Sequence, residues 1–436
     1  MGIEMPTSNH KRTQRGLLGN KLYRRTFTAY AAASFGDWFD MLAIQVLVAY
    51  RWEAGPLMLA LVPVSLALPG IVLGSVAGVA ADRLNKLQLM RWCDLLTAAL
   101  TAALLLVPNM FWLLPVLALR SAVSALNVPA QQSLTRSLVR EDQLLQAASL
   151  NGLVNQSSKI AGPLLGGLAL TVLSPAWCIG FNVCMRLFSY AMLLFIKINA
   201  IDGKAAAVCG SARNGSDSSE GGKPLPFRQM WKEGWSFILR NRLLRNTMLF
   251  GLLGALSIQI VDFQFASLFL VLAPDKEYML GWLVAAAGAG AVGAIALLNK
   301  IGRSLGYGLR LGGGYAMIGA AVGGLGLLPP GAAALPVLLL GLLLGAGNGM
   351  FIIAFNYCLQ KETPPGMTGR VFGIQSMVLS TVMIAAPLLG GFLVELAGPR
   401  EIFGRFGVVI LLLGAAGILL SRWLWPAEQK RVDAEA

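Results

Sequence analysis

Gly162-Pro163-Leu164-Leu165-Gly166-Gly167 lies within a long apolar run of this 436-residue chain. A near copy, Ala386-Pro387-Leu388-Leu389-Gly390-Gly391, follows 224 positions later (386 minus 162), close to half of the chain length. Proline removes a backbone donor and the glycine pair removes side-chain bulk, so each stretch lets a helix bend and a neighbouring helix approach closely. Equivalent stretches in two halves predict two parallel structural repeats, an arrangement typical of secondary transporters.

The composition indicates a polytopic membrane protein. Hydrophobic residues make up 56% of the chain and charged residues only 13%, and the mean hydropathy is +0.66, far from the values of a soluble domain. Lys and Arg outnumber Asp and Glu by 35 to 21. In so apolar a chain this excess is expected in loops, where it sets topology. The expected partner is therefore the lipid bilayer and not nucleic acid.

Cysteine and histidine usage argues against a metal site. The five cysteines form no CxxC pair, and four lie in or near apolar runs, which indicates reduced packing residues. His10, the single histidine, lies in a polar N-terminal tail, so a histidine relay inside the membrane is excluded. The tail has no short apolar segment before a cleavage site, so we expect no removable signal peptide. No metal or other cofactor is expected.

Runs of roughly 20 mostly apolar residues predict spanning helices. Twelve such segments are expected, at 27–50, 56–81, 88–107, 111–129, 146–172, 176–198, 246–272, 279–299, 308–328, 333–357, 370–396 and 403–425. Basic residues gather in the N-terminal tail and after every second segment, whereas the alternate loops are poor in Lys and Arg. This distribution predicts that both termini and the central loop lie in the cytoplasm.

The central segment divides the chain. Residues 215–222 have the Gly- and Ser-rich composition of a flexible linker. The aromatic and basic run that follows, residues 227–240, predicts an amphipathic helix on the cytoplasmic membrane surface. We therefore expect an N-terminal six-helix bundle over 1–200, a cytoplasmic linker over 201–229, and a C-terminal six-helix bundle with the amphipathic helix at its start over 230–436.

Three motifs resemble those of the major facilitator superfamily. The run from Gly78 to Lys86, expected between the second and third helices, resembles the superfamily's G-x-x-x-D-R-x-G-R/K loop, with Asn85 where Gly is usual. Arg120 lies in the fourth segment, where the superfamily often carries an intramembrane Arg. The run 162–167 resembles the bend motif associated with antiporters. The resemblance covers nearly the whole chain. It implies an all-α integral membrane fold of twelve transmembrane helices in two pseudo-symmetric six-helix bundles.

Finer features resemble the branch that includes the enterobactin exporter and macrolide efflux proteins. They are Gly36-Asp37, the run from Val128 through Asn151, and Gly369-Arg370-Val371-Phe372-Gly373. That branch consists mostly of exporters, and the resemblance names no substrate. It implies a bacterial inner membrane and a fold that operates as a monomer.

Acidic residues inside predicted spans are candidates for proton coupling or substrate binding, because a central charge costs about 2.5–3.5 kcal/mol. Asp37 and Asp40 stand three residues apart, on one face of the first segment. Asp262 is the clearest acid of the second half. Asp37 and Asp40 either exchange protons and contact substrate or lock helices together through a basic partner. Asp262 is either a proton carrier or a cavity ligand.

Basic residues in the spans are the candidate counter-charges. Arg120 keeps its proton, so it would hold Asp37 or Asp40 ionised until a proton or substrate competes; the alternatives are a permanent ion pair and a snorkelling side chain. Lys159 and Arg186 are the other candidate cations. Four polar side chains either line the cavity or form interhelical hydrogen bonds: Asn155, Asn348, Asn356 and Gln375.

Gating is expected at one membrane face and at the two bends. The candidate gating residues are Gly78, Asp82, Arg83, Gly162, Pro163, Gly166, Gly167 and Pro387. Asp82 and Arg83 would pair with neighbouring helix ends in one conformation and separate in the other. The alternative is a charged loop that only anchors topology.

These patterns together predict a transporter and not an enzyme, since no Walker loop, ATP-binding domain or nucleophile elbow is visible. We expect a secondary active transporter that exports a small organic molecule by proton antiport and alternating access, with Asp37, alone or with Asp40 or Asp262, exchanging the proton. The basic residues would suit an anionic siderophore, and the acidic residues would suit a cationic amphiphilic drug. The alternatives are a lysophospholipid transporter and a non-transporting membrane sensor.

Overall fold

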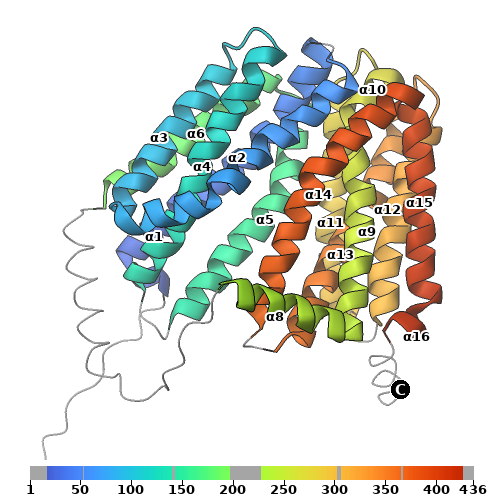
Figure 1. The fold of residues 1–436 in the computed structure, drawn as a ribbon. Helices are drawn as coiled ribbons and strands as arrows, with labels where there is room; N and C mark the ends of the chain where they lie inside the picture. Colours follow the sequence, from blue (N-terminus) through green and yellow to red (C-terminus); the bar gives the residue numbers. More distant parts are fainter. Residues whose placement is uncertain are drawn as a thin grey trace, which may run out of the picture.

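The computed structural model describes residues 17–52, 54–139, 143–196, 227–301, 306–364 and 367–425. Regular structure over these residues is helical (Figure 1). The N-terminal half contains η1 (Leu17–Gly19), α1 (Lys21–Val46), η2 (Leu47–Arg51), α2 (Pro56–Arg83), α3 (Lys86–Leu104), α4 (Met110–Leu138), α5 (Leu144–Leu170) and α6 (Pro175–Leu194). The C-terminal half contains α8 (Phe227–Arg240), α9 (Arg242–Asp262), α10 (Phe265–Leu272), α11 (Tyr278–Ile301), η5 (Gly308–Gly312), α12 (Gly313–Leu327), α13 (Ala334–Glu362), α14 (Thr368–Ala397), α15 (Pro399–Leu419) and α16 (Ser421–Leu424).

A helix lies on each of the twelve predicted segments. Nine of the described helices are long and apolar enough to cross a membrane. The chain is therefore an all-α, multi-pass membrane protein. Several helices extend beyond the predicted apolar core: α1 begins six residues before 27, and α4 ends nine residues after 129. Helical hydrogen bonding continues there through polar residues, which hydropathy alone places in loops.

Asparagine side chains cap several helices. Asn85 accepts hydrogen bonds from the backbone N–H groups of Leu87 and Gln88, both at 3.2 Å. This cap starts α3 with only two residues between it and the end of α2. Of the run from Gly78 to Lys86, expected between the second and third helices, only Leu84 and Asn85 lie between them, because α2 continues to Arg83, two residues beyond the predicted 81. The cap also accounts for asparagine where the superfamily's loop usually has glycine.

The seventh predicted segment, 246–272, is also not one helix. It divides into α9 and α10, separated by Phe263 and Gln264. The Gln264 amide donates from Nε2 to the carbonyl of Pro56 at 3.0 Å, and Oε1 accepts from Ser267 at 3.1 Å. The buried amide at the break therefore connects the two halves of the molecule.

The first half forms one bundle and the second half another. In the first, α1 packs on α5 and α6, and α4 packs on α2 and α3; in the second, α11 packs on α13, and α12 packs on α13 and α15. The halves meet where α5 contacts α11, α2 contacts α14, and η2 contacts α10. Figure 1 shows α10 at one end of the molecule and α8 across the other end. We call these the gate end and the α8 end.

The amphipathic helix α8 lies across the ends of the C-terminal helices (Figure 1). Glu233 of α8 forms an ion pair with Arg370 of α14 at 2.5 Å, and Gly234 lets α8 lie against Ile374. Trp231 is 43% exposed on the same helix. Residues 201–226 of the predicted linker, 201–229, lie outside the described residues. The helix α8 begins at Phe227, three residues before the expected boundary at 230.

The repeated sequence stretch is also repeated in the packing. A Cβ added at Gly166 would lie 3.5 Å from Phe39 Cα of α1, and one at Gly390 would overlap the carbonyl of Ile260 in α9. The first glycine of each pair therefore packs inside its own half. Both helices continue without interruption through the stretch.

The second glycine of each pair packs against the opposite half. A Cβ added at Gly167 would lie 2.5 Å from the carbonyl oxygen of Gly281 in α11. One added at Gly391 would lie 2.8 Å from the carbonyl oxygen of Pro56 in α2. The α5–α11 and α14–α2 contacts are therefore pseudo-symmetric backbone contacts near the gate end, and only glycine allows them.

Candidate functional site

One group of buried charges lies between α1, α4 and α6. The side chains of Arg120 in α4 and Asp40 in α1 are 8% and 1% exposed. Arg120 donates from Nη1 to Asp40 Oδ2 and from Nη2 to Asp40 Oδ1, the latter at 3.2 Å. Asn182 of α6 donates from Nδ2 to Asp40 Oδ2 at 2.8 Å. Asp40 is thus held by a two-pronged guanidinium and by an amide.

A second group lies beside it, between α3, α4 and α6. Arg186 of α6 donates from Nη1 to Asp94 Oδ1 of α3 at 3.1 Å, and the two side chains are 3% and 1% exposed. Ser189 donates from Oγ to Asp94 Oδ2 at 2.5 Å, and Asn127 donates from Nδ2 to Asp94 Oδ1 at 3.2 Å. Asp94 therefore has three hydrogen-bond donors.

Asp37 joins the two groups. Its carboxylate accepts from Arg186 Nη2, at 2.7 Å to Oδ1 and 2.5 Å to Oδ2. Oδ1 also lies 3.5 Å from Arg120 Nη2. The Asp37 side chain is 39% exposed, whereas those of Asp40 and Asp94 are 1% exposed. Among the three carboxylates, Asp37 is the one whose side chain is accessible from outside the group.

The charge network, as we call Asp37, Asp40, Asp94, Arg120 and Arg186, contains three carboxylates and two guanidinium groups. With every carboxylate ionised, it has one negative charge in excess. Buried ions need partners, because removing each from water costs several kcal/mol. A single proton on the reachable carboxylate would leave two complete ion pairs. The network can therefore take up and release one proton or one cation without exposing an unpaired buried charge.

Local sequence features bring the network together. Asp37 and Asp40 lie one turn apart on α1, as their spacing predicts. Gly36 lies against α6, where an added Cβ would be 2.7 Å from Asn182 Oδ1 and 3.0 Å from Met185 Cβ. The glycine thus lets α6 approach α1 closely enough for Asn182 to reach Asp40.

Two of the predicted charges lie outside the network. Lys159 is exposed in the middle of α5, and Asp262 is half-buried at the last residue of α9. Neither side chain has a hydrogen bond or an ion pair within the part of the chain that the structure describes. Of the three candidate cations, Arg120 and Arg186 therefore have carboxylate partners, whereas Lys159 has none among the described residues.

The remaining predicted residues are dispersed. Asn155 of α5 and Asn348 of α13 are exposed, and Asn356 of α13 and Gln375 of α14 are half-buried. Their role as cavity lining stays a prediction.

The predicted gating residues lie in three helices: α2, α5 and α14. Gly162 packs against Trp38, beside the contacts of Gly166 and Gly167 given above, and Pro387 is buried in α14. Pro163 lies in α5, and Gly78, Asp82 and Arg83 end α2, but these four side chains lie outside the described part of the structure.

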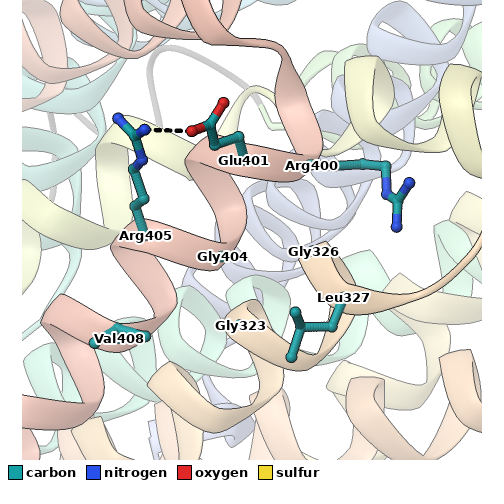
Figure 2. A pocket seen from close by; sticks show the side chains of 8 residues that line it. All are labelled: Gly323, Gly326, Leu327, Arg400, Glu401, Gly404, Arg405 and Val408. Carbon is teal, nitrogen blue, oxygen red and sulfur yellow. Dashed lines mark hydrogen bonds and ion pairs between the residues drawn. The ribbon is translucent and has the colours of Figure 1, made fainter.

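A surface groove lies apart from the network, between the gate ends of α12 and α15 (Figure 2). It encloses about 480 Å³ and is lined by Gly323, Gly326, Leu327, Arg400, Glu401, Gly404, Arg405 and Val408. Glu401 and Arg405 form an ion pair, from which Arg400 points away (Figure 2). The exposed fractions of Leu327 and Val408, 78% and 53%, are those of a lipid-facing surface. We therefore do not assign transport to this groove.

Comparison with known families decides the class. The model of the Major Facilitator Superfamily matches residues 26–387. The chain belongs to this superfamily. Its members are transporters, and the predicted class of fold and function is thereby confirmed.

Relatives within the superfamily include efflux proteins. The chain is 28% identical over 405 residues to an uncharacterized MFS-type transporter, YfiS, of Bacillus subtilis (strain 168), with 92% of each chain covered. It is 24% identical to the multidrug efflux pump Tap of Mycolicibacterium fortuitum, over 86% of this chain and 91% of Tap. A crystal structure of a mutant of the nucleoside transporter NupG superposes with a TM-score of 0.67, over 92% of this chain and 99% of NupG. The sequences are 12% identical, so this similarity shows the shared fold.

Asp94 is the member of the network that sequence reasoning missed. It lies seven residues into the predicted third segment, close to the basic residues that mark its end. The sequence does carry one signal that Asp94 is buried. It lies one helical turn after Arg91 and one turn before Ala98, with apolar residues on either side.

Arg91 has a different role from the network cations. It donates to the carbonyls of Leu193 at 2.8 Å and Ile196 at 2.6 Å, at the C-terminal end of α6. A cation there satisfies carbonyl groups that the helix leaves free. Arg91 thus stabilises a helix end, whereas Asp94, one turn away, faces the buried cations.

Proposed function

We propose that this superfamily member is a proton-coupled exporter of a small amphiphilic organic molecule, either a drug-like compound or a siderophore, and that Asp37 carries the coupled proton. The observation that carries the proposal is the place of Asp37 in the charge network. It contacts both guanidinium groups and is 39% exposed, whereas the other two carboxylates are buried. Export as the direction is supported by the similarity to the efflux pump Tap.

Protonation of Asp37 changes the charge balance of the network. When Asp37 is ionised, it holds Arg186 and attracts Arg120 across α1, α4 and α6. When it is protonated, each arginine keeps one buried aspartate and the third contact weakens. The relative energies of two arrangements of α1 and α6 therefore depend on one proton, as a coupled transporter requires.

Alternating access would come from relative motion of the two halves. The glycine contacts between the halves lie near the gate end, at Gly167 with Gly281 and at Gly391 with Pro56. This arrangement is the one expected when access is closed at the gate end and open toward the α8 end. With α8 on the cytoplasmic surface of a bacterial inner membrane, as the basic loops predict, the structure would correspond to the inward-facing state.

The network also bears on the choice of substrate. Of the three cations that would suit an anionic siderophore, Arg120 and Arg186 are both engaged by buried carboxylates. Lys159 alone of the three has no partner in the described residues. The geometry therefore favours an amphiphilic compound over a substrate with several negative charges.

The test is transport by purified protein in proteoliposomes. Asp37→Asn should abolish accumulation driven by a pH gradient, because the amide cannot exchange the proton, while substrate exchange in the absence of a gradient continues. Asp275→Asn, in an exposed loop, is the matched control and should behave as wild type. If Asp37→Asn kept its dependence on the pH gradient, Asp37 would not be the coupling group. If the wild type moved lysophospholipid or nothing at all, the lysophospholipid and sensor alternatives would replace drug or siderophore export.

A further inference from the structure

A group of cations at the α8 end lies in the other half of the molecule from the charge network. Lys361, in the last turn of α13, places Nζ 5.3 Å from the ring centroid of Tyr357 and 5.9 Å from that of Tyr307. Arg310 of η5 places Cζ 5.7 Å from the same Tyr357 centroid. Because both cations lie over one ring, their charges are at most 11.0 Å apart (5.3 plus 5.7 Å). We call Tyr307, Arg310, Tyr357 and Lys361 the tyrosine cluster.

The tyrosine cluster carries an excess of positive charge. The turn η5, the helix α12 that continues it, and α13 together contain two cations and one acid, Glu362. The Glu362 carboxylate accepts a hydrogen bond from the Tyr307 hydroxyl at 3.4 Å, and within the described part of the chain it forms no ion pair with Lys361. The ring faces attract both cations and hold two like charges near each other. A bound anion would offset the repulsion between them.

The length of α13 places the tyrosine cluster at the depth of the lipid head groups. The 29 residues from Ala334 to Glu362, at about 1.5 Å each, span about 44 Å, which is about the thickness of a bilayer with its head groups. Lys361 is the last residue but one, and Tyr357 lies one turn before it. Tyrosine at the end of a spanning helix is typical of the membrane interface.

The face of α13 that carries Tyr357 is exposed and apolar. Tyr357 follows Leu339 by eighteen residues (357 minus 339), which is about five helical turns, so the two side chains lie on one face. They are 44% and 56% exposed. Asn348, midway between them and therefore on the opposite face, is the exposed polar residue of the helix middle. The side of α13 that carries Tyr357 thus faces the bilayer.

The backbone positions Arg310 beside this lipid-facing surface. It lies in the π-helical turn η5, a rare conformation that is frequent at functional sites. Gly312 fixes the turn to α15, because a Cβ added there would lie 2.6 Å from the carbonyl oxygen of Gly414. Leu309, next to Arg310, is 48% exposed. The arginine is therefore held at the edge of the bundle, with apolar surface adjacent to it.

We propose that the tyrosine cluster binds the head group of an anionic phospholipid in the leaflet at the α8 end. Arg310 and Lys361 contact the lipid phosphate, and the acyl chains lie along the exposed face of α13. A guanidinium group binds phosphate through two parallel hydrogen bonds, and an ammonium group adds a point charge. Basic pockets between spanning helices on the cytoplasmic side suit such head groups. The site does not depend on the proposed transport function.

The test is native mass spectrometry of the full-length protein in a neutral detergent. The protein is titrated with dioleoylphosphatidylglycerol, which is anionic, or with dioleoylphosphatidylcholine, whose phosphate is offset by its choline group. The first phosphatidylglycerol should bind at least fivefold more tightly than phosphatidylcholine. Lys361→Gln and Arg310→Gln should each weaken it about fivefold, equivalent to about 1 kcal/mol, which is the contribution of one basic residue near an anionic surface.

The control variants separate this site from the general charge of the α8 end. Lys232→Gln removes an exposed cation of α8 at the same end and should leave both lipid affinities unchanged. Tyr357→Phe keeps the ring under both cations and should also bind as wild type. Tyr357→Leu removes the ring that holds the two cations near each other and should weaken phosphatidylglycerol while leaving phosphatidylcholine unchanged.

Three outcomes would overturn the proposal. Equal wild-type affinities for the two lipids, or unchanged phosphatidylglycerol binding in both charge variants, would show that the two cations only anchor the helix ends at the interface. An equal loss of affinity in Lys232→Gln would show attraction to the whole basic surface. Displacement of phosphatidylglycerol by an equal concentration of ammonium glycerol 3-phosphate, which lacks the acyl chains, would show a site for a soluble anion.

Discussion

At the scale of single residues, the network shows how a buried charge keeps its place in a membrane. Asp94 is 1% exposed and is held by Arg186, Ser189 and Asn127. None of these three partners lies in its own helix. Asp94 therefore connects α3 to α4 and α6 and acts as a fixed counter-ion, in contrast to the reachable Asp37.

Replacing Asp94 should destabilise the fold more than it affects coupling. Asp94→Asn leaves Arg186 with Asp37 as its remaining carboxylate and should lower the free energy of unfolding by about 1–3 kcal/mol. Scanning fluorimetry of the detergent-solubilised protein measures the loss as a lower Tm. Asp275→Asn should show no shift. A wild-type Tm in Asp94→Asn would contradict the assignment of Asp94 as a structural partner of Arg186.

At the scale of elements, α5 and α14 each carry two adjacent glycines, and the two glycines of each pair contact different helices. Gly166 contacts α1 within its half at ordinary van der Waals distance, and Gly167 contacts the α11 backbone across the halves. Gly391 repeats the second contact on α2. Because the cross-half contacts form near the gate end, they stabilise the conformation closed at that end.

Adding one methyl group at these positions should change the conformational equilibrium. Gly167→Ala places a Cβ 2.5 Å from the carbonyl oxygen of Gly281, so the gate end should open. Spin labels at Val172 and Leu335, which are 85% and 65% exposed, would report a longer distance by pulsed electron resonance. Gly166→Ala is the control, since its Cβ has room at 3.5 Å. Identical distance distributions for the two variants would rule out the gate assignment.

At the scale of the whole molecule, the α8 end differs from the gate end: it carries basic residues, and the helix α8 lies across it. The α8 end carries α8 with its exposed Trp231 and Lys232, and the last turn of α13 with Lys361. An amphipathic helix across the helix ends is the arrangement expected at a membrane interface. Together with the basic residues, it predicts that the α8 end faces the cytoplasm.

Cysteine labelling checks this orientation. In a variant without the exposed Cys184 and without Cys209 of the predicted linker, a membrane-impermeant maleimide should label Lys276→Cys in intact cells. It should label Lys232→Cys only after permeabilisation, because α8 lies on the opposite side of the membrane from the loop before α11. The reverse pattern would show that the orientation, and the inward-facing assignment with it, is wrong.

The sequence by itself determined the class of fold. Apolar runs predict helix positions well because a bilayer forces each segment to bury its backbone groups in a helix. The repeated proline and glycine stretch revealed the two halves. Hydropathy did not locate the break at Phe263 and Gln264, because composition does not show the hydrogen bonds of the Gln264 side chain to Pro56 and Ser267.

Only the tertiary structure decided the pairing of the charges. Asp40, Arg120 and Arg186 were predicted candidates from the cost of a charge in the membrane, but their partners come from helices far apart in the sequence: Asp40 and Arg120 are 80 positions apart, and Asp94 and Arg186 are 92 apart. The same packing adds Asp94 to the network and leaves Lys159 and Asp262 outside it. A one-dimensional pattern records that a charge is costly. Which opposite charge offsets that cost is fixed by the packing of α1, α3, α4 and α6.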